Sequence, residues 1–379
     1  MPNLNQSREL VLITGGAGFI GSHLADELLA AGYRVRVLDH LDKQVHPEGT
    51  LPKYLDPAVE FVAGDILDIE ALKRALEGVD FVYHFAAKVG VGQSMYRIRE
   101  YTEVNALGTA VLLEALLENP VKKLIVASSM SVYGEGSYVD GTGQSAFPKQ
   151  RRENHFTQHN SWDFRGEGSE TLKPEPTAES KPCLPASMYA QGKYDQERMC
   201  LIFGEAYDIP TVAMRFFNVY GPRQALSNPY TGVLAIFASR LMNGRAPLIF
   251  EDGEQRRDFV HVKDVACACR LALETEAARN CVVNVGSGEQ RSIRQIAEAI
   301  IAAMGRKGEI EPEITGRFRA GDVRHCYADT TLARHLLEYR PRVNFHDGLV
   351  ELVGWLEGQI AIDRVEDAQR ELTTRGLAK

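Results

Sequence analysis

The sequence contains few cysteines, no long hydrophobic run and no excess of positive charge. Its six cysteines are scattered, and Cys267 and Cys269 lie two positions apart on an expected helix, where they point in different directions. This arrangement argues against a disulfide framework and against a cysteine-rich metal cluster. We therefore expect no bound metal and a reducing, cytoplasmic location.

Membranes and nucleic acids are also poor candidates as partners. No apolar stretch approaches the roughly 20 residues of a membrane span, and the polar residues 1–9 lack the apolar core of a signal peptide. The net charge is −8, without a long basic run, which argues against binding to nucleic acid or to an anionic membrane. The 379 residues are enough for one large domain or two interlocked domains with a sizeable core.

A glycine-rich turn lies near the N-terminus, between an expected strand over 10–13 and a helical pattern over 23–29. Gly15 permits a tight turn, Gly18 lets backbone N–H groups approach a pyrophosphate, and Gly21 lets the helix pack closely on the strand. A strand, a glycine turn and a helix in this order predict a dinucleotide-binding site.

The next expected strand, 34–38, ends at Asp39. A carboxylate at this position accepts hydrogen bonds from a ribose 2′-hydroxyl and repels a 2′-phosphate. The sequence therefore predicts NAD as the cofactor and not NADP.

Strands and helices continue to alternate as far as residue 217, which predicts a doubly wound parallel α/β sheet, the Rossmann fold, over 1–217. Polar or small residues follow several strand ends and should meet in one cleft, among them Asp65, Ala86, Ser129 and Phe217. The expected strands are 59–63, 80–85, 123–127 and 211–216, and the expected helices are 68–77, 98–117 and 188–207.

Residues 218–379 predict mainly a smaller mixed α/β domain for the substrate, with an exchange of segments near 257–275. A capping box formed by Ser292 and Gln295 predicts the start of a helix that runs to about residue 304. The charged tail, 360–379, is expected to form a peripheral helix.

Tyr189 and Lys193 are spaced i, i+4, so they lie on one face of a helix, one turn apart. A free tyrosine has a pKa of about 10, and a fixed cation beside it favours the phenolate. The pair is typical of a surface contact when it occurs alone. Beside a dinucleotide site it predicts a catalytic base.

Together these segments resemble the extended short-chain dehydrogenase/reductases that act on nucleotide-diphospho-sugars, over nearly the whole chain. The resemblance rests on the glycine turn, 64–66, 84–87, Asn105, 128–134, Tyr189-x-x-x-Lys193, 215–223, 257–262 and 319–322.

The resemblance implies a role for each matching residue. Tyr189 takes a proton from a sugar hydroxyl, Lys193 lowers the pKa of Tyr189 and holds the nicotinamide ribose, and Ser129 bonds the same sugar oxygen. The implied NAD-binding residues are Gly15, Gly18, Phe19, Ile20, Gly21, Asp39, Asp65, Ile66, Phe85, Ala86, Ala87, Asn105, Ser128, Tyr189, Lys193 and Phe217. The implied substrate-binding residues are Ser131, Asn218, Arg257, Arg319 and Cys326.

The two residues after Ser129 indicate the reaction. Relatives that eliminate water from a hexose carry Asp-Glu there, and decarboxylating relatives usually carry a Glu, whereas this chain has Met130 and Ser131. Neither side chain transfers protons at neutral pH. We therefore expect a 4-epimerase, which oxidises C4 and returns the hydride to the other face of a transient ketone.

Several alternatives remain at this point. A 2-epimerase of a deoxysugar nucleotide could use the same groups, a 4,6-dehydratase ranks below it, and a non-catalytic dinucleotide sensor ranks last. The chain is most similar to dTDP-L-rhamnose 4-epimerase-type members, whose product would be a 6-deoxy-L-talose nucleotide, with UDP-glucose or UDP-glucuronate as alternative substrates. Cys326, in place of a bulkier Tyr, implies a roomier sugar pocket.

A polar insert over about 135–181 departs from the family pattern. Its aromatic residues suggest that it packs against the protein, as a flap over the sugar end of the cleft or as an oligomer contact. Only His155 and His159 could serve there as metal ligands, so we expect no zinc. The family also implies a homodimer, formed through the helices at 98–117 and 188–207.

Overall fold

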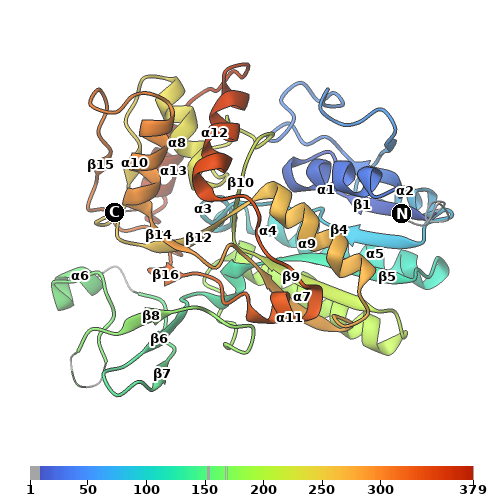
Figure 1. Cartoon of the computed structure of the whole chain (residues 1–379), viewed down its shortest axis with the longest axis horizontal. Helices are drawn as coiled ribbons and strands as arrows, with labels where there is room; N and C mark the ends of the chain where they lie inside the picture. Colours follow the sequence, from blue (N-terminus) through green and yellow to red (C-terminus); the bar gives the residue numbers. More distant parts are fainter. Residues whose placement is uncertain (1–8, 152–153, 167, 169, 379) are drawn as a thin grey trace.

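Seven parallel strands form the central sheet of the computed structural model, in the order β13-β9-β5-β4-β1-β2-β3. Strands β1, β4, β5 and β9 of this sheet are labelled in Figure 1. The structure describes residues 9–151, 154–166, 168 and 170–378. Strands β1 and β5 are buried along their whole length, as is usual for a parallel sheet covered on both faces. The sheet comprises β1 (Leu10–Thr14), β2 (Arg34–Asp39), β3 (Glu60–Ala63), β4 (Phe81–His84), β5 (Lys123–Ser129), β9 (Thr211–Phe216) and β13 (Cys281–Val285).

Helices cover both faces of this sheet, which confirms the predicted doubly wound α/β fold. On one face, α1 (Phe19–Ala30), α9 (Val262–Glu274) and α11 (Thr331–Leu337) share an apolar core with the sheet. On the other face lie α2 (Ile69–Leu76), α5 (Gly108–Glu118) and α7 (Met188–Ala206).

The helix expected over 98–117 is divided into three parts. Helix α4 (Ile98–Thr102) passes into a π-helical turn, Glu103–Leu107, before α5 begins. Asn105 lies in this turn, fully buried, and its amide both accepts from the backbone N of Lys88 (2.7 Å) and donates to its carbonyl (3.1 Å). Helical periodicity does not reveal such a turn, because it depends on this contact with a distant loop.

The smaller domain packs three helices together beside a short mixed sheet. The helices α8 (Val233–Met242), α10 (Ile293–Ala303) and α12 (Phe345–Leu356) share one apolar core, and α10 begins with the predicted capping box. The mixed sheet comprises β10 (Asn218–Tyr220), β12 (Arg256–His261), β14 (Gln290–Ser292) and β16 (His325–Cys326), and β11 (Leu248–Ile249) pairs with β15 (Glu313–Ile314).

Segments cross between the two domains, and one of them, α9 (Val262–Glu274), lies within the span of 257–275 where an exchange was expected. Strand β12 stays in the smaller sheet, whereas α9, β13 and α11 belong to the nucleotide domain. The apolar face of α9 packs against α1, and β13 adds a seventh parallel strand beside β9. The boundary between the two domains is therefore set by where α9 and β13 are buried, and not by their order in the sequence.

The tail forms the expected helix, and one side of this helix packs against the rest of the protein. Its helix, α13 (Val365–Thr374), buries Ala368 and Leu372. Leu372 contacts the short helix α3 (Val91–Ser94) at Gly92, so the tail reaches the nucleotide domain. No described helix is long and apolar enough to cross a membrane.

Helix α7 is held on the sheet by a buried ion pair. Glu197 on α7 accepts from Arg215 on β9 at 2.6 and 2.9 Å and from the hydroxyl of Ser128 on β5 at 2.6 Å. All three residues are buried.

We expect Glu197→Ala to destabilise the protein by about 3–5 kcal/mol, because it leaves the Arg215 guanidinium buried and unpaired. Chemical denaturation followed by circular dichroism measures this change. The matched control is Asp195→Ala on the same helix, which loses only an exposed contact with Gln191 and should cost no more than about 0.5 kcal/mol. Equal effects of the two substitutions would contradict the structural role of the pair.

Candidate active site

A cavity of about 610 Å³ lies at the carboxyl ends of the central strands and extends between the two domains. It brings together residues from across the chain, including the glycine turn, the end of β5, the start of α7 and the smaller domain. The predicted site residues that line it are Gly15, Gly18, Phe19, Ile20, Gly21, Asp39, Asp65, Ile66, Phe85, Ala86, Ala87, Ser128, Ser129, Ser131, Tyr189, Lys193, Phe217, Asn218, Arg257 and Arg319.

The glycine turn forms a cradle that side chains would fill. Gly15 has a φ of +70°, and a Cβ there would lie 2.8 Å from the backbone N of Ala86. A Cβ on Gly21 would lie 2.6 Å from the Cα of Gly16. The turn leads into the N-terminus of α1, where free backbone N–H groups favour an anion, so this part of the cavity fits a dinucleotide pyrophosphate.

Asp39 is fixed at the end of β2 with its side chain at the cavity. One carboxylate oxygen accepts from the backbone N of Ala17 in the glycine turn (3.1 Å), and the other accepts from the backbone N of Leu41 (2.9 Å). The carboxylate is therefore oriented before any ligand binds, which fits the ribose-binding role predicted for it.

Lys193 is almost fully buried, and its ammonium donates to the side-chain oxygen of Gln196 at 2.8 Å. The amide nitrogen of Gln196 lies 2.9 Å from His84, whose ring also contacts Thr14 (2.9 Å). Burial lowers the pKa of Lys193 to about 8 and that of His84 to about 3, so His84 is a neutral core residue. Sequence reasoning missed Gln196, although its i+3 position from Lys193 places it on the same helix face.

Tyr189, at the start of α7, lies within hydrogen-bonding distance of Ser129, at the end of β5. Burial raises the pKa of Tyr189, and its hydrogen bond with Ser129 acts in the opposite direction without offsetting the rise. The resemblance implied a lowered pKa caused by Lys193, and the structure shows a raised one. The physical reason is that desolvation of the Tyr189 phenol is the largest influence on its pKa. The Lys193 ammonium is meanwhile hydrogen-bonded to Gln196.

Ser131 adds a second hydroxyl beside Ser129. The hydroxyl of Ser131 donates to that of Ser129 at 2.9 Å, and the Ser131 backbone N donates to the same oxygen at 3.2 Å. Between them, Met130 is buried in a small apolar cluster that includes Tyr133 and Phe217. The short 3-10 helix Met130–Tyr133 thus presents hydroxyls, and no carboxylic acid, to the catalytic end of the cavity.

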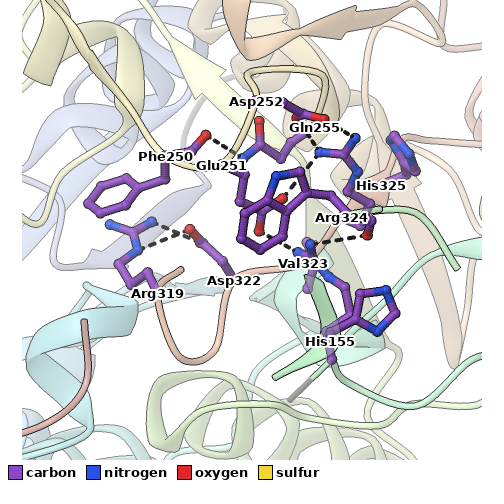
Figure 2. Close-up of polar contacts among 12 residues, drawn as sticks. His155, Phe250, Glu251, Asp252, Gln255, Arg319, Asp322, Val323, Arg324 and His325 are labelled. Atoms are coloured by element: carbon purple, nitrogen blue, oxygen red, sulfur yellow. Dashed lines mark hydrogen bonds and ion pairs between the residues drawn. The ribbon is translucent and has the colours of Figure 1, made fainter. Parts of the chain in front are cut away.

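Two arginines line the opposite part of the cavity, and both are already held in place. Arg319 forms a fork with Asp322 (3.1 and 2.8 Å) and stacks on the ring of Phe250 at 5.0 Å (Figure 2). Arg257 donates to the carbonyls of Arg324 (3.0 Å) and Val323. Nearby, the side-chain oxygen of Asn218 is buried without a hydrogen-bond partner in the structure.

Two predicted residues do not line the cavity. Asn105 lies behind it and holds the backbone of Lys88. Cys326 is buried, with its thiol 3.9 Å from the hydroxyl of Thr177, and burial raises its pKa to about 12. The expectation that Cys326 widens the sugar pocket is therefore not met, because its side chain is buried in the apolar cluster of Met130 and Phe217 and does not reach the cavity.

A polar bridge joins the two domains beside the cavity. The Gln44 side chain donates to Asn228 at 2.9 Å and to Gln93 at 3.3 Å. Gln44 and Asn228 both line the cavity, as does Leu372 of the tail. Sequence reasoning had no signal for these contacts, since the residues lie far apart in the chain.

This fold and this site define a dinucleotide-dependent enzyme of the short-chain dehydrogenase/reductase class. The chain belongs to the NAD dependent epimerase/dehydratase family, whose model matches residues 11–286, and its cofactor is NAD. Among the described residues, no three His, Cys, Asp or Glu side chains are grouped to hold a metal ion.

The similar proteins include nucleotide-sugar epimerases over most of their length. A dTDP-L-rhamnose 4-epimerase from Burkholderia thailandensis is 33% identical over 92% of this chain and 95% of its own. The crystal structure of Thermotoga maritima UDP-glucose 4-epimerase with UDP-glucose gives a TM-score of 0.75 at 31% identity, covering 92% of this chain and 98% of that one. A Thermus thermophilus UDP-glucose 4-epimerase complex with NAD gives 0.73 at 32% identity, covering 93% and 100%.

We expect Asp39→Ala to weaken NAD binding about ten- to a hundredfold, through loss of charge-assisted hydrogen bonds, and to reduce the discrimination against NADP. Titration of both cofactors into the cofactor-stripped enzyme measures these effects. Asp56→Ala is the control, because Asp56 bonds only the backbone of its own exposed turn. Unchanged NAD affinity in Asp39→Ala would show that the carboxylate does not contact the ribose.

Proposed function

We propose that this enzyme interconverts the C4 epimers of a nucleotide-diphospho-sugar. Tyr189 acts as the base that removes the proton of the C4 hydroxyl, and Ser129 hydrogen-bonds the same oxygen. The C4 hydride passes to NAD⁺, which leaves a ketone. The sugar then turns within the cavity, and the hydride and the proton return to its other face, so NAD⁺ is regenerated in each cycle.

The raised pKa of Tyr189 is consistent with this cycle. NAD⁺, when bound, would supply the hydride acceptor, and its positive charge would favour the phenolate of Tyr189. Lys193, with a pKa of about 8, is mostly a cation at neutral pH and can hold the nicotinamide ribose as well as support the phenolate. The base is therefore active chiefly when the cofactor is oxidised.

The turn after Ser129 is the observation that carries the choice of reaction. Elimination of water needs an acid to protonate the leaving hydroxyl, and this turn offers only Met130, which is buried, and Ser131. Asp322 also lines the cavity. Burial alone would raise its pKa, but Arg319 outweighs burial and lowers it, so Asp322 stays ionised and is a poor acid. Simple return of the hydride needs no such acid.

The sugar is proposed to be 6-deoxygenated, as in the conversion of dTDP-L-rhamnose to dTDP-6-deoxy-L-talose. Small and apolar groups meet near the start of α7, where a Cβ on Gly321 would lie 3.3 Å from Val91 and 3.5 Å from the carbonyl of Ala186. All three residues line the cavity, together with Val323. A C6 methyl suits this wall, whereas a C6 carboxylate would be desolvated there. The 33% identical Burkholderia relative supports the same substrate.

We also propose a homodimer in the cytoplasm. Large apolar side chains are exposed on α4, the adjoining π-helical turn, α5 and α7, the expected interface helices: Ile98, Leu107, Leu117, Met188, Ile202 and Tyr207. A second copy would cover them. All six cysteines are free thiols, which suits a reducing compartment.

Tyr189→Phe should lower turnover by about 10²–10⁴, because it removes the general base. Release of the cofactor on denaturation measures how much NAD the variant still binds, so that loss of the base is distinguished from loss of the cofactor. A variant that retained more than a tenth of the activity would rule out Tyr189 as the base.

The substrate panel is dTDP-L-rhamnose, UDP-glucose and UDP-glucuronate, each followed by NMR in D₂O. We expect inversion at C4 for dTDP-L-rhamnose, with no deuterium at C4, because the returning hydride comes from the sugar itself. Incorporation of deuterium at C5 with a 4-keto-6-deoxy product from a glucose nucleotide would indicate a dehydratase instead. Inversion at C2 would favour the 2-epimerase alternative.

A further inference from the structure

The insert, residues 135–181, lies alongside the chain segment 319–329, which we call the arginine segment because it carries Arg319 and Arg324. Near the start of the insert, the backbone N of Gly136 donates to the carbonyl of His325 at 2.9 Å. Near its end, Thr177 exchanges backbone hydrogen bonds with Tyr327 (2.8 Å) and Asp329 (3.1 Å). No described residue of the insert lines the cavity, so the insert is not a flap over it. Instead, the insert supports the arginine segment, which forms part of the cavity wall, from the side away from the cavity.

A buried carboxylate of the insert holds the backbone of the arginine segment. Both oxygens of Glu135 accept from the backbone N of Arg324 at 2.8 Å, and one lies 3.4 Å from the backbone N of His325. The same peptide units face Arg257 on their other side, through the carbonyls of Val323 and Arg324. Glu135 and the cavity-lining Arg257 are thus joined through one short stretch of backbone.

The Arg324 side chain makes a second connection (Figure 2). It is fully buried and donates to Asp163 of the insert at 2.7 Å, to Asp252 at 2.6 and 2.9 Å, and to Glu251 at 3.1 Å. Glu251 and Asp252 directly follow Phe250, the ring on which Arg319 stacks. Arg151 of the insert lies 2.7 Å from Glu251, which completes a cluster of charges between the insert and the smaller domain.

We propose that the insert is a positioning element for Arg257 and Arg319, and that it sets the affinity for the diphosphate of the nucleotide ligand. This proposal rests on the substrate-binding role that the family resemblance implies for the two arginines, whose guanidinium forks suit a diphosphate. A guanidinium that is already oriented loses less conformational freedom when it binds a phosphate, so rigid support from behind increases affinity. Glu135 and Asp163 act through the arginine segment and touch no ligand.

Asp163→Asn tests the proposal, because it removes the charge that holds Arg324 and keeps the shape of the side chain. Calorimetric titration with dTDP and with UDP measures nucleotide affinity without any assumption about turnover. We expect the dissociation constant for both to rise at least fivefold, with bound NAD unchanged. In the epimerase assay we expect KM to rise, whereas kcat should stay within twofold of its original value.

The matched control is Asp140→Asn, which lies in a surface turn of the same insert and bonds only within that turn. It should leave nucleotide affinity within twofold. If Asp163→Asn fails to fold, Tyr327→Phe replaces it, since this change removes only the hydroxyl that donates to the carbonyl of Pro174 (2.7 Å). A folded variant of either kind with unaltered dTDP and UDP affinity would overturn the proposal.

A double-mutant cycle separates positioning from general destabilisation. Arg319→Lys replaces the planar fork by a single ammonium, so the additional effect of Asp163→Asn in that background should fall below twofold. Fully additive losses would show that Asp163 acts independently of Arg319 and would overturn the proposal. If no sugar nucleotide is turned over but Asp163→Asn still weakens nucleotide binding, the proposed reaction fails and the positioning role stands.

Discussion

The buried pair between Glu197 and Arg215 is the contact on which the arrangement of the active site depends. It ties α7 to β9, and through Ser128 it ties α7 to β5 as well. Tyr189 and Lys193 come from α7, and Ser129 comes from the end of β5, so their mutual placement follows from this junction. Arg215 also lies over the ring of Tyr133 at 4.6 Å, which steadies the turn that carries Met130 and Ser131.

Burial at this junction also determines the electrostatics of the site. Desolvation lowers the pKa of Lys193 and raises that of Tyr189, so the protein by itself opposes the ion pair that the chemistry needs. The positive charge of the oxidised cofactor shifts this balance towards the phenolate. Coupling the base to the redox state of NAD in this way suits a reaction in which the cofactor is oxidised again before each new sugar.

The two arginines that line the cavity are held in place by a different set of contacts. Arg257 and Arg319 are held by backbone carbonyls and by Asp322, and the segment that supplies those partners is supported by the insert. A long polar insert is thereby integrated into the fold through buried charges, which require partners in the low-dielectric interior. None of its described residues lines the cavity.

Much of the fold and of the site could be predicted from the sequence, because short-range patterns specify them. The glycine turn, Asp39, the i, i+4 pair and the capping box at Ser292 each depend on residues close together in the chain. Parallel strands that end at one edge of the sheet then place distant residues in one cleft, and twenty predicted residues do line the cavity. The direction of the pKa shift at Tyr189 could not be predicted, since it depends on how fully the folded protein excludes water.

The sequence by itself determined the class of fold and the cofactor, and it predicted that Tyr189, Lys193 and Ser129 share one site. Only the tertiary structure decided where the insert and the tail lie, that Cys326 is buried and does not line the cavity, and which groups hold the arginines. Glu135 and Leu372 carry no local signature of their roles. Their partners are distant in the chain, and which buried charge or apolar surface meets which partner is settled only when the whole core has packed.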